Sequence, residues 1–270
     1  MLKRLSHVRL VCIAAGVAVL LPPPLRADQA DKRGIIRDAR AAYYSLRRLG
    51  LESFEATMTP NWDAILSVSA IPAEQKAVTI SIVSGMHFVV SYGVDGKTKV
   101  TTRADTPARN EQMQRGYDQI FSGMNQFVEG FYQTYSPFMV ESPFPPVESE
   151  YTVDTIDIGY RVSYMEEGKA SIVTRMTKTF AIVETVITTP EFDSVIKPTF
   201  VTTEQGYVLS AYSGYYKRKT DKDATLVDAK IEHRLMEGFR LPSKLVFDSS
   251  IGSAPNKTEV VFSNYIVKRR

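Results

Sequence analysis

The second half of the chain alternates apolar and polar side chains with a period of two residues, which is typical of half-buried β-strands. The strictest run covers residues 155–164, where Ile156, Ile158 and Tyr160 alternate with polar residues, and it predicts one strand. Comparable runs predict strands at residues 171–176, 180–188, 195–202, 207–216, 227–235, 239–247 and 258–267. The connections are short, so we expect an up-and-down antiparallel meander of about seven or eight strands.

The first half is dominated by apolar residues at spacings of three and four, which indicate amphipathic helices. Residues 31–50 carry such a stripe from Ile35 to Leu49, and Gly50 suits the C-terminal cap. We therefore expect one helix over the whole segment. Four basic residues lie off its stripe, and they are Arg37, Arg40, Arg47 and Arg48.

Shorter signals occupy the next segment. Residues 54–58 alternate and predict a strand that Pro60 ends. Asp95 and Gly96 form a dipeptide that favours a hairpin turn. We also expect a short helix capped by Asn61, a helix running from Pro72 toward Ser84, and paired strands at residues 87–92 and 97–102.

The clearest helical pattern covers residues 112–135, with Thr106 as the expected cap and Pro107 at the first helical position. Two interpretations of its apolar stripe stay open. The stripe either fills a plain core against the sheet or forms the pliable wall of a cavity, because Met and Phe adapt to irregular apolar ligands. The stripe consists of Met113, Tyr117, Ile120, Phe121, Met124, Phe127, Val128, Phe131 and Tyr135.

Three glycines interrupt the same helix. Gly116, Gly123 and Gly130 recur every seven residues, so they lie close to one side of it. A glycine inside a helix costs about 1 kcal/mol relative to alanine. The repeat predicts either that something packs close to the helix backbone or that the helix is only marginally stable.

A helix-rich first half and a β-rich second half of the chain favour the α+β class. We expect helices on one face of a large antiparallel sheet and water on the other. The chain has no flexible linker and no repeat of fixed period. A proline-rich segment, residues 136–149, separates the helix-rich residues 28–135 from the β-rich residues 150–268. We predict a single domain over residues 28–270.

The N-terminal segment has the pattern of a cleavable export signal. A basic start precedes the apolar residues 10–21, and three prolines then lead to a small residue at Ala27. The apolar run is shorter than the roughly 20 residues that span a bilayer, although a membrane anchor is the alternative. We therefore predict a signal peptide at residues 1–27, cleaved after Ala27 or Ala30, and a periplasmic or secreted protein.

Cleavage would change the balance of charges. The chain has 33 basic and 30 acidic side chains, and residues 1–27 hold four of the basic ones. The remaining 29 basic and 30 acidic residues give no support for nucleic-acid binding. The single cysteine, Cys12, also lies in the signal, so we expect no disulfide, cysteine nucleophile or thiolate metal site. We expect no stable membrane span after cleavage.

The usual zinc, serine-hydrolase and nucleotide motifs are missing from the sequence, so we expect no metal and no cofactor. His233 shares the apolar face of its strand, where it is either a core residue or a ligand contact or general base. Asp154 and Asp157 are a weaker acid–base pair, because Asp157 lies on the polar face of its strand. The residues that we expect to line an apolar ligand cavity are Met113, Tyr117, Ile120, Phe121, Met124, Phe127, Phe131 and His233.

The two ends of the chain resemble the LolA/LolB superfamily of periplasmic lipoprotein carriers. The resemblance rests on a leading helix followed by the sequence SFEA at residues 53–56. It also rests on GFRLPSK at residues 238–244 and VFSNYIV at residues 261–267. The resemblance implies a curled antiparallel half-barrel whose concave face is covered by helices, and it implies transport of lipids or lipoproteins across the periplasm. It transfers no functional residue.

Three functions are compatible with these features. We predict a non-catalytic carrier of a lipid, an acylated protein or a similar hydrophobic ligand. The main alternative is a secreted structural module that binds envelope proteins, because the chain has 14 tyrosines, including Tyr212, Tyr215 and Tyr216 near one strand end. A hydrolase of unrecognised type, using His233 with a nearby serine or aspartate, is the third.

Overall fold

The computed structural model describes residues 27–68, 71–166 and 169–270, so the predicted signal peptide lies outside the described residues except for Ala27. The helices are α1 (Ala27–Ala41), α2 (Trp62–Ser67), α3 (Ala73–Val83) and α4 (Glu111–Met139). The strands are β1 (Leu51–Pro60), β2 (Met86–Gly93), β3 (Thr98–Ala104), β4 (Tyr151–Ile156), β5 (Gly159–Glu166), β6 (Ala170–Thr177), β7 (Ile182–Thr188), β8 (Phe192–Thr203), β9 (Gly206–Arg218), β10 (Thr225–Met236), β11 (Phe239–Ile251) and β12 (Ala254–Arg269).

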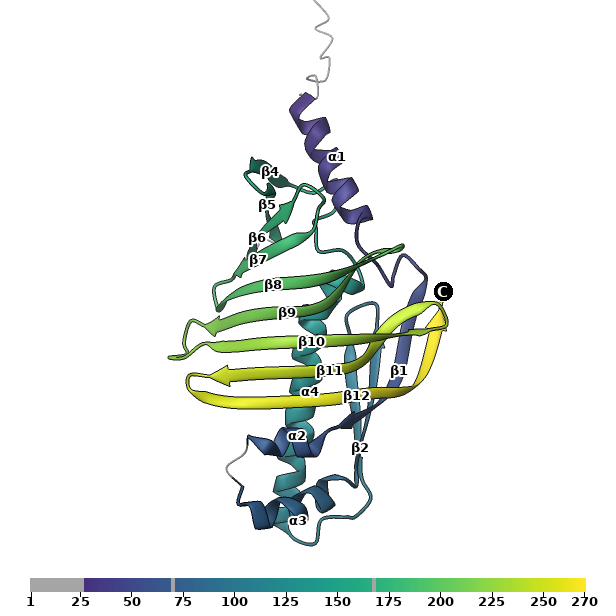
Figure 1. Ribbon diagram of the computed structural model, residues 1–270, viewed down its shortest axis with the longest axis vertical. Coiled ribbons are helices and arrows are strands. Elements are labelled where there is room, and N and C mark those ends of the chain that lie inside the picture. Colours follow the sequence, from purple (N-terminus) through teal and green to yellow (C-terminus); the bar gives the residue numbers. More distant parts are fainter. Residues whose placement is uncertain (1–26, 69–70, 167–168) are drawn as a thin grey trace, which may run out of the picture.

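The described strands form one 12-stranded antiparallel sheet (Figure 1). The strands from β4 to β12 follow one another as an up-and-down meander. β12 then pairs with β1, and the sheet continues through β2 to β3. The outer strands β3 and β4 do not pair with each other, so the sheet is open. The prediction of one large antiparallel sheet accompanied by helices is confirmed.

The predicted single strand at residues 155–164 is wrong, because the chain turns back within it. β4 ends at Ile156, which pairs with Gly159 at the start of β5. Gly159 has a φ of 153°, and a Cβ there would lie 2.4 Å from the backbone of Thr177. Ile158 is an exposed turn residue. Its apolar side chain continues the alternation of the sequence without belonging to a strand.

α1 ends at Ala41, so the helix predicted for residues 31–50 is too long. Beyond Ala41 the backbone pairs with the sheet instead of with itself. The N–H of Tyr44 donates to the carbonyl of Tyr207 at 3.1 Å, and the N–H of Tyr207 donates to the carbonyl of Ala42 at 2.9 Å. Because these bonds satisfy the backbone groups that a longer helix would use, contact with a distant strand overrides the local helical pattern.

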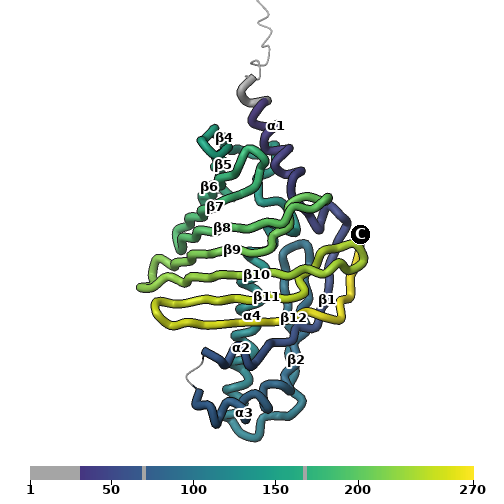
Figure 2. Tube along the Cα trace, in the orientation of Figure 1, coloured from purple at the N-terminus to yellow at the C-terminus, as the bar shows by residue number. Residues whose placement is uncertain are grey.

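α4 crosses one face of the sheet, and the strands run across it in both views (Figures 1 and 2). Its aromatic side chains reach strands from both halves of the chain. Tyr132 stacks on Tyr92 of β2 with 4.6 Å between ring centroids, and Phe127 contacts Phe247 of β11 at 5.0 Å. The apolar stripe read from the sequence is therefore the side of α4 that faces the sheet.

The start of α4 differs from the prediction. Asn110 caps the helix, because its backbone is extended and its side chain accepts a hydrogen bond from the N–H of Met113 at 2.9 Å. Thr106 and Pro107, which we expected to begin the helix, are exposed residues that precede it. At the other end the helix continues beyond the predicted residue 135 to Met139.

The glycines of α4 face open space. A Cβ added at Gly116, Gly123 or Gly130 would meet no atom within 4 Å. The prediction that something packs closely against the backbone at these positions is therefore wrong. The cost of glycine in a helix remains, and no contact offsets it.

The buried core draws on both halves of the chain. One cluster of buried residues contains Phe54 from β1 and Leu245 from β11. The proline-rich segment that separates the two halves in the sequence contributes Phe144 to the same cluster. This segment therefore packs against the core.

The sheet face opposite α4 carries a row of charged and polar side chains that extends from β4 to β12. Neighbours in the row are paired by strand register or by ion pairs, and three of the pairs have short contacts. Arg161 and Asp154 lie 2.8 Å apart, and Arg175 and Glu184 lie 3.3 Å apart. The Ser213 hydroxyl donates to Asp228 at 2.7 Å. The row consists of Asp154, Arg161, Arg175, Glu184, Lys197, Ser213, Asp228, Asp248 and Lys257.

Candidate functional site

The predicted cavity wall lies along α4, and the burial of the helix is graded. From Val128 to Met139 most apolar side chains are fully buried, whereas between Met113 and Phe127 only Tyr117 is. The half-buried members of the predicted set are Met113, Ile120, Phe121, Met124 and Phe127, all packed against the edge of the core. The C-terminal half of α4 is thus sealed against the sheet, and the N-terminal half leaves apolar surface accessible.

Aromatic side chains from two other elements, β2 and α2, lie at this accessible half. Phe88 of β2 contacts Phe121 with ring centroids 5.9 Å apart, and Trp62 of α2 contacts Phe88 at 6.3 Å. Nearby α3 exposes Val78 and Ile82, which are 62% and 43% exposed. α2 and α3 lie at the same end of the molecule as the N-terminal half of α4 (Figure 1). We call this apolar region, formed by α2, α3, β2 and residues 113–127, the apolar end.

His233 does not belong to the apolar end. Its ring stacks on Tyr135 with 6.0 Å between centroids, and its Nε2 lies 3.3 Å from the Tyr135 hydroxyl. A helix rises about 1.5 Å per residue, so Tyr135 lies about 33 Å along α4 from Met113. Burial, with a smaller effect of Arg240, lowers the pKa of His233 to about 4. A histidine with this pKa is a weak base at neutral pH.

The paired carboxylates also lack the features of an acid–base site. Asp154 is held by Arg161 on the exposed sheet face, and Asp157 lies in the exposed turn after β4. Among the described residues, no group of three or more His, Cys, Asp or Glu side chains could hold a metal ion.

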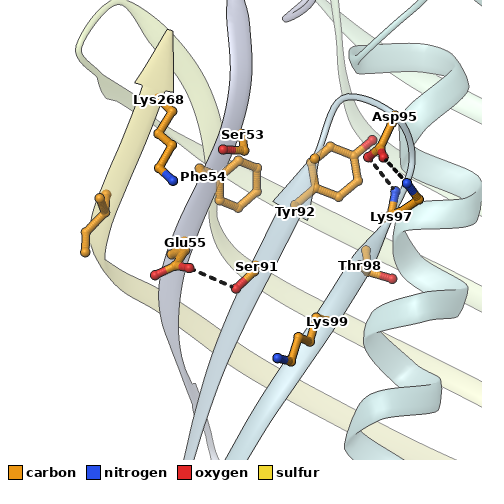
Figure 3. A pocket seen from close by; sticks show the side chains of 12 residues that line it. Ser53, Phe54, Glu55, Ser91, Tyr92, Asp95, Lys97, Thr98, Lys99 and Lys268 are labelled. Carbon is orange, nitrogen blue, oxygen red and sulfur yellow. Dashed lines mark hydrogen bonds and ion pairs between the residues drawn. The ribbon is translucent and has the colours of Figure 1, made fainter.

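The sheet also has a shallow depression that the sequence did not indicate, with a volume of about 400 Å³. It lies over β12, β1, β2 and β3 (Figure 3). Strand register places Glu55 opposite Ser91 and Ser91 opposite Lys99. Glu55 accepts a hydrogen bond from Ser91 at 3.3 Å, and Lys97 pairs with Asp95 at 2.8 Å. Half of the twelve lining residues are exposed, whereas Phe54 and Tyr92 are buried.

No described helix combines the length and the hydropathy that a bilayer crossing requires. No model of a known protein family, no curated protein and no solved structure matches the chain.

Proposed function

We propose that this protein is an exported, non-catalytic carrier that binds a lipid or an acylated protein at its apolar end. In this proposal the sheet is curled, the helices cover its concave face, and the acyl chain lies along residues 113–127 of α4. The observation that carries the proposal is the burial gradient of α4, in which a sealed half continues into a half with accessible Met and Phe side chains.

The chemistry of this surface suits an acyl chain. Met and Phe side chains adapt to ligands of irregular shape, and burying each methylene group of a ligand contributes about 0.8 kcal/mol. The sealed half of α4, from Val128 on, would limit how far a chain could extend. Ligand binding would cover apolar surface that otherwise contacts water.

A pair of charge substitutions on adjacent residues tests the proposal. Met124 is half-buried on the apolar side of α4, whereas Gly123 is exposed and its Cβ position is open. Met124→Glu should weaken binding of a fluorescent fatty acid by about tenfold or more, because it places a charge against the acyl chain. Gly123→Glu introduces the same charge one residue away and should leave binding unchanged.

The cargo is identified by native mass spectrometry of the protein purified from its own host, followed by organic extraction. A co-purifying lipid or acylated peptide supports the carrier. If the wild-type protein binds neither the fatty acid nor a cellular lipid, or if both glutamate variants bind as well as the wild type does, the proposal is wrong.

One observation favours the alternative of a module that binds proteins. On the face opposite α4, strand register aligns five apolar side chains from β6 to β10, and they are Val173, Val186, Val195, Tyr215 and Leu226. Of the three tyrosines expected at an interface, Tyr212 is buried and Tyr216 contacts Thr134 of α4, so only Tyr215 lies on this outer face. Sedimentation of Leu226→Lys against the wild type would test whether this row forms an oligomer interface.

A further inference from the structure

Four arginines surround a cleft at the opposite end of α4 from the apolar end. The cleft has a volume of about 440 Å³ and lies between the end of α1, the turn that follows it and the segment that leaves α4. Its lining residues are Arg37, Arg40, Ala41, Ser45, Arg47, Arg48, Glu141, Ser142 and Val147. We call it the arginine cleft.

The early end of α1 produces this arrangement. Arg37 and Arg40 lie on the last turns of the helix, and the chain then folds back. The N–H of Leu46 donates to Met139 at 2.9 Å, and the N–H of Arg47 donates to Val140 at 3.1 Å. These bonds hold the turn against the C-terminal end of α4, so arginines from the helix and from the turn line one cleft.

Backbone carbonyls fix three of the four guanidinium groups. Arg40 donates to the carbonyls of Phe144 and Pro145 at 2.6 and 2.9 Å, and Arg48 donates to the carbonyl of Tyr43 at 2.5 Å. Arg47 donates to the carbonyl of Val94. A neutral carbonyl orients a guanidinium group without cancelling its charge, so these contacts position the arginines and leave the cleft positive.

Carboxylates compensate only part of this charge. Among the described residues, Glu141 pairs with Arg47 at 2.7 Å and Asp38 pairs with Arg37 at 3.3 Å, and the four arginines make no other ion pair. Two positive charges therefore remain without an acidic partner. Like charges that the backbone holds together repel each other, and an anion bound between them would relieve that repulsion.

We propose that the arginine cleft binds a phosphate group, carried either by a free phosphate ester or by a lipid headgroup. A phosphate monoester has a charge of about −1.5 to −2 at neutral pH, which matches the excess better than one carboxylate does. Guanidinium groups also match phosphate geometry with paired N–H donors. α4 spans 29 residues, or about 43 Å, so this site goes beyond the apolar end and does not depend on ligand binding there.

The test removes the same number of charges from two places. Arg37→Gln with Arg48→Gln neutralises two cleft arginines, and Arg161→Gln with Arg175→Gln neutralises two exposed arginines on the sheet face opposite α4. Binding of glycerol phosphate is measured by calorimetry, and binding to vesicles that contain phosphatidic acid, a phosphate monoester, is measured by sedimentation against phosphatidylcholine vesicles. The cleft variant should lose about tenfold or more in affinity, and the control should stay close to the wild type.

The two arms distinguish the source of the phosphate. Binding of soluble glycerol phosphate that depends on the cleft identifies a free ester, and vesicle binding alone that depends on the cleft identifies a headgroup. Equal losses in both variants would show general electrostatic attraction and would overturn the proposal, as would a wild-type protein that binds neither probe. Arg37→Gln alone serves if the double variant unfolds, because Arg37 is exposed and its side chain bonds to Asp38 of the same helix.

Discussion

Tyr135 of α4 and His233 of β10 stack with 6.0 Å between ring centroids, and the Tyr135 hydroxyl lies 3.3 Å from Nε2 of the histidine. This contact joins the sealed half of α4 to the centre of the sheet. Burial, with a smaller effect of Arg240, lowers the pKa of His233 to about 4 from its ordinary value of 6.5. The folded protein therefore favours the neutral form of the His233 ring.

The first prediction is that His233 makes the fold sensitive to acid. Between pH 6.5 and 4 the unfolded chain binds a proton at His233 that the folded chain does not bind. The free energy of unfolding should therefore fall as the pH falls through this window, by up to about 3 kcal/mol. Urea unfolding at pH 7 and pH 4.5 measures the loss, and His233→Gln should show a smaller one. If His233→Gln lost as much stability between pH 7 and pH 4.5 as the wild type does, the acid sensitivity would come from carboxylates and not from His233.

The second prediction concerns the glycines of α4. Gly123→Ala and Gly130→Ala should each raise the free energy of unfolding by about 1 kcal/mol, because alanine favours the helix and its Cβ meets no atom within 4 Å. Thermal and urea unfolding measure the gain. Gly206→Ala is the contrasting control, since φ is 107° there and a Cβ would lie 2.5 Å from the carbonyl of Ala42. That change should destabilise the fold.

The alternation of side chains predicted the strands from β6 to β12 because each of these strands buries the side chains of one face and exposes those of the other. The alternation was misleading at Ile158, because this exposed apolar residue lies in a turn and still fits the period of two residues. The helical spacing of three and four failed after Ala41, because the partner of Tyr44 is Tyr207, and no local pattern shows a pairing over that distance.

The candidate sites were also predictable from the sequence only in part. Composition and spacing were enough to predict the apolar stripe from Met113 to Tyr135, because an amphipathic helix places such residues on one side. The burial gradient depends on α2, α3 and β2, which the stripe itself does not reveal. The sequence showed the four arginines of the cleft only as residues off the apolar stripe of the helix predicted for residues 31–50. These arginines line one cleft only because α1 ends at Ala41, which the sequence pattern did not show.

The third prediction tests the contact that holds the turn after α1. The Tyr43 hydroxyl donates to the carbonyl of Phe180 at 2.9 Å and accepts from the N–H of Ile182 at 2.8 Å. Tyr43→Phe should lower the free energy of unfolding by about 2 kcal/mol, because it leaves both backbone groups without their partner in a buried place. Tyr215→Phe, on the exposed face, should change it by less than about 0.5 kcal/mol. Equal effects in urea unfolding would contradict this role of Tyr43.

The last prediction separates the cap that the structure shows from the one that the sequence indicated. Asn110 accepts a hydrogen bond from the N–H of Met113, whereas Thr106 lies before the helix. Asn110→Ala should therefore lower the free energy of unfolding by about 1 kcal/mol, and Thr106→Ala should have almost no effect. Urea unfolding of the two variants measures the difference, and amide hydrogen exchange in residues 111–114 locates it. A larger loss from Thr106→Ala would mean that the helix in solution begins where the sequence alone placed it.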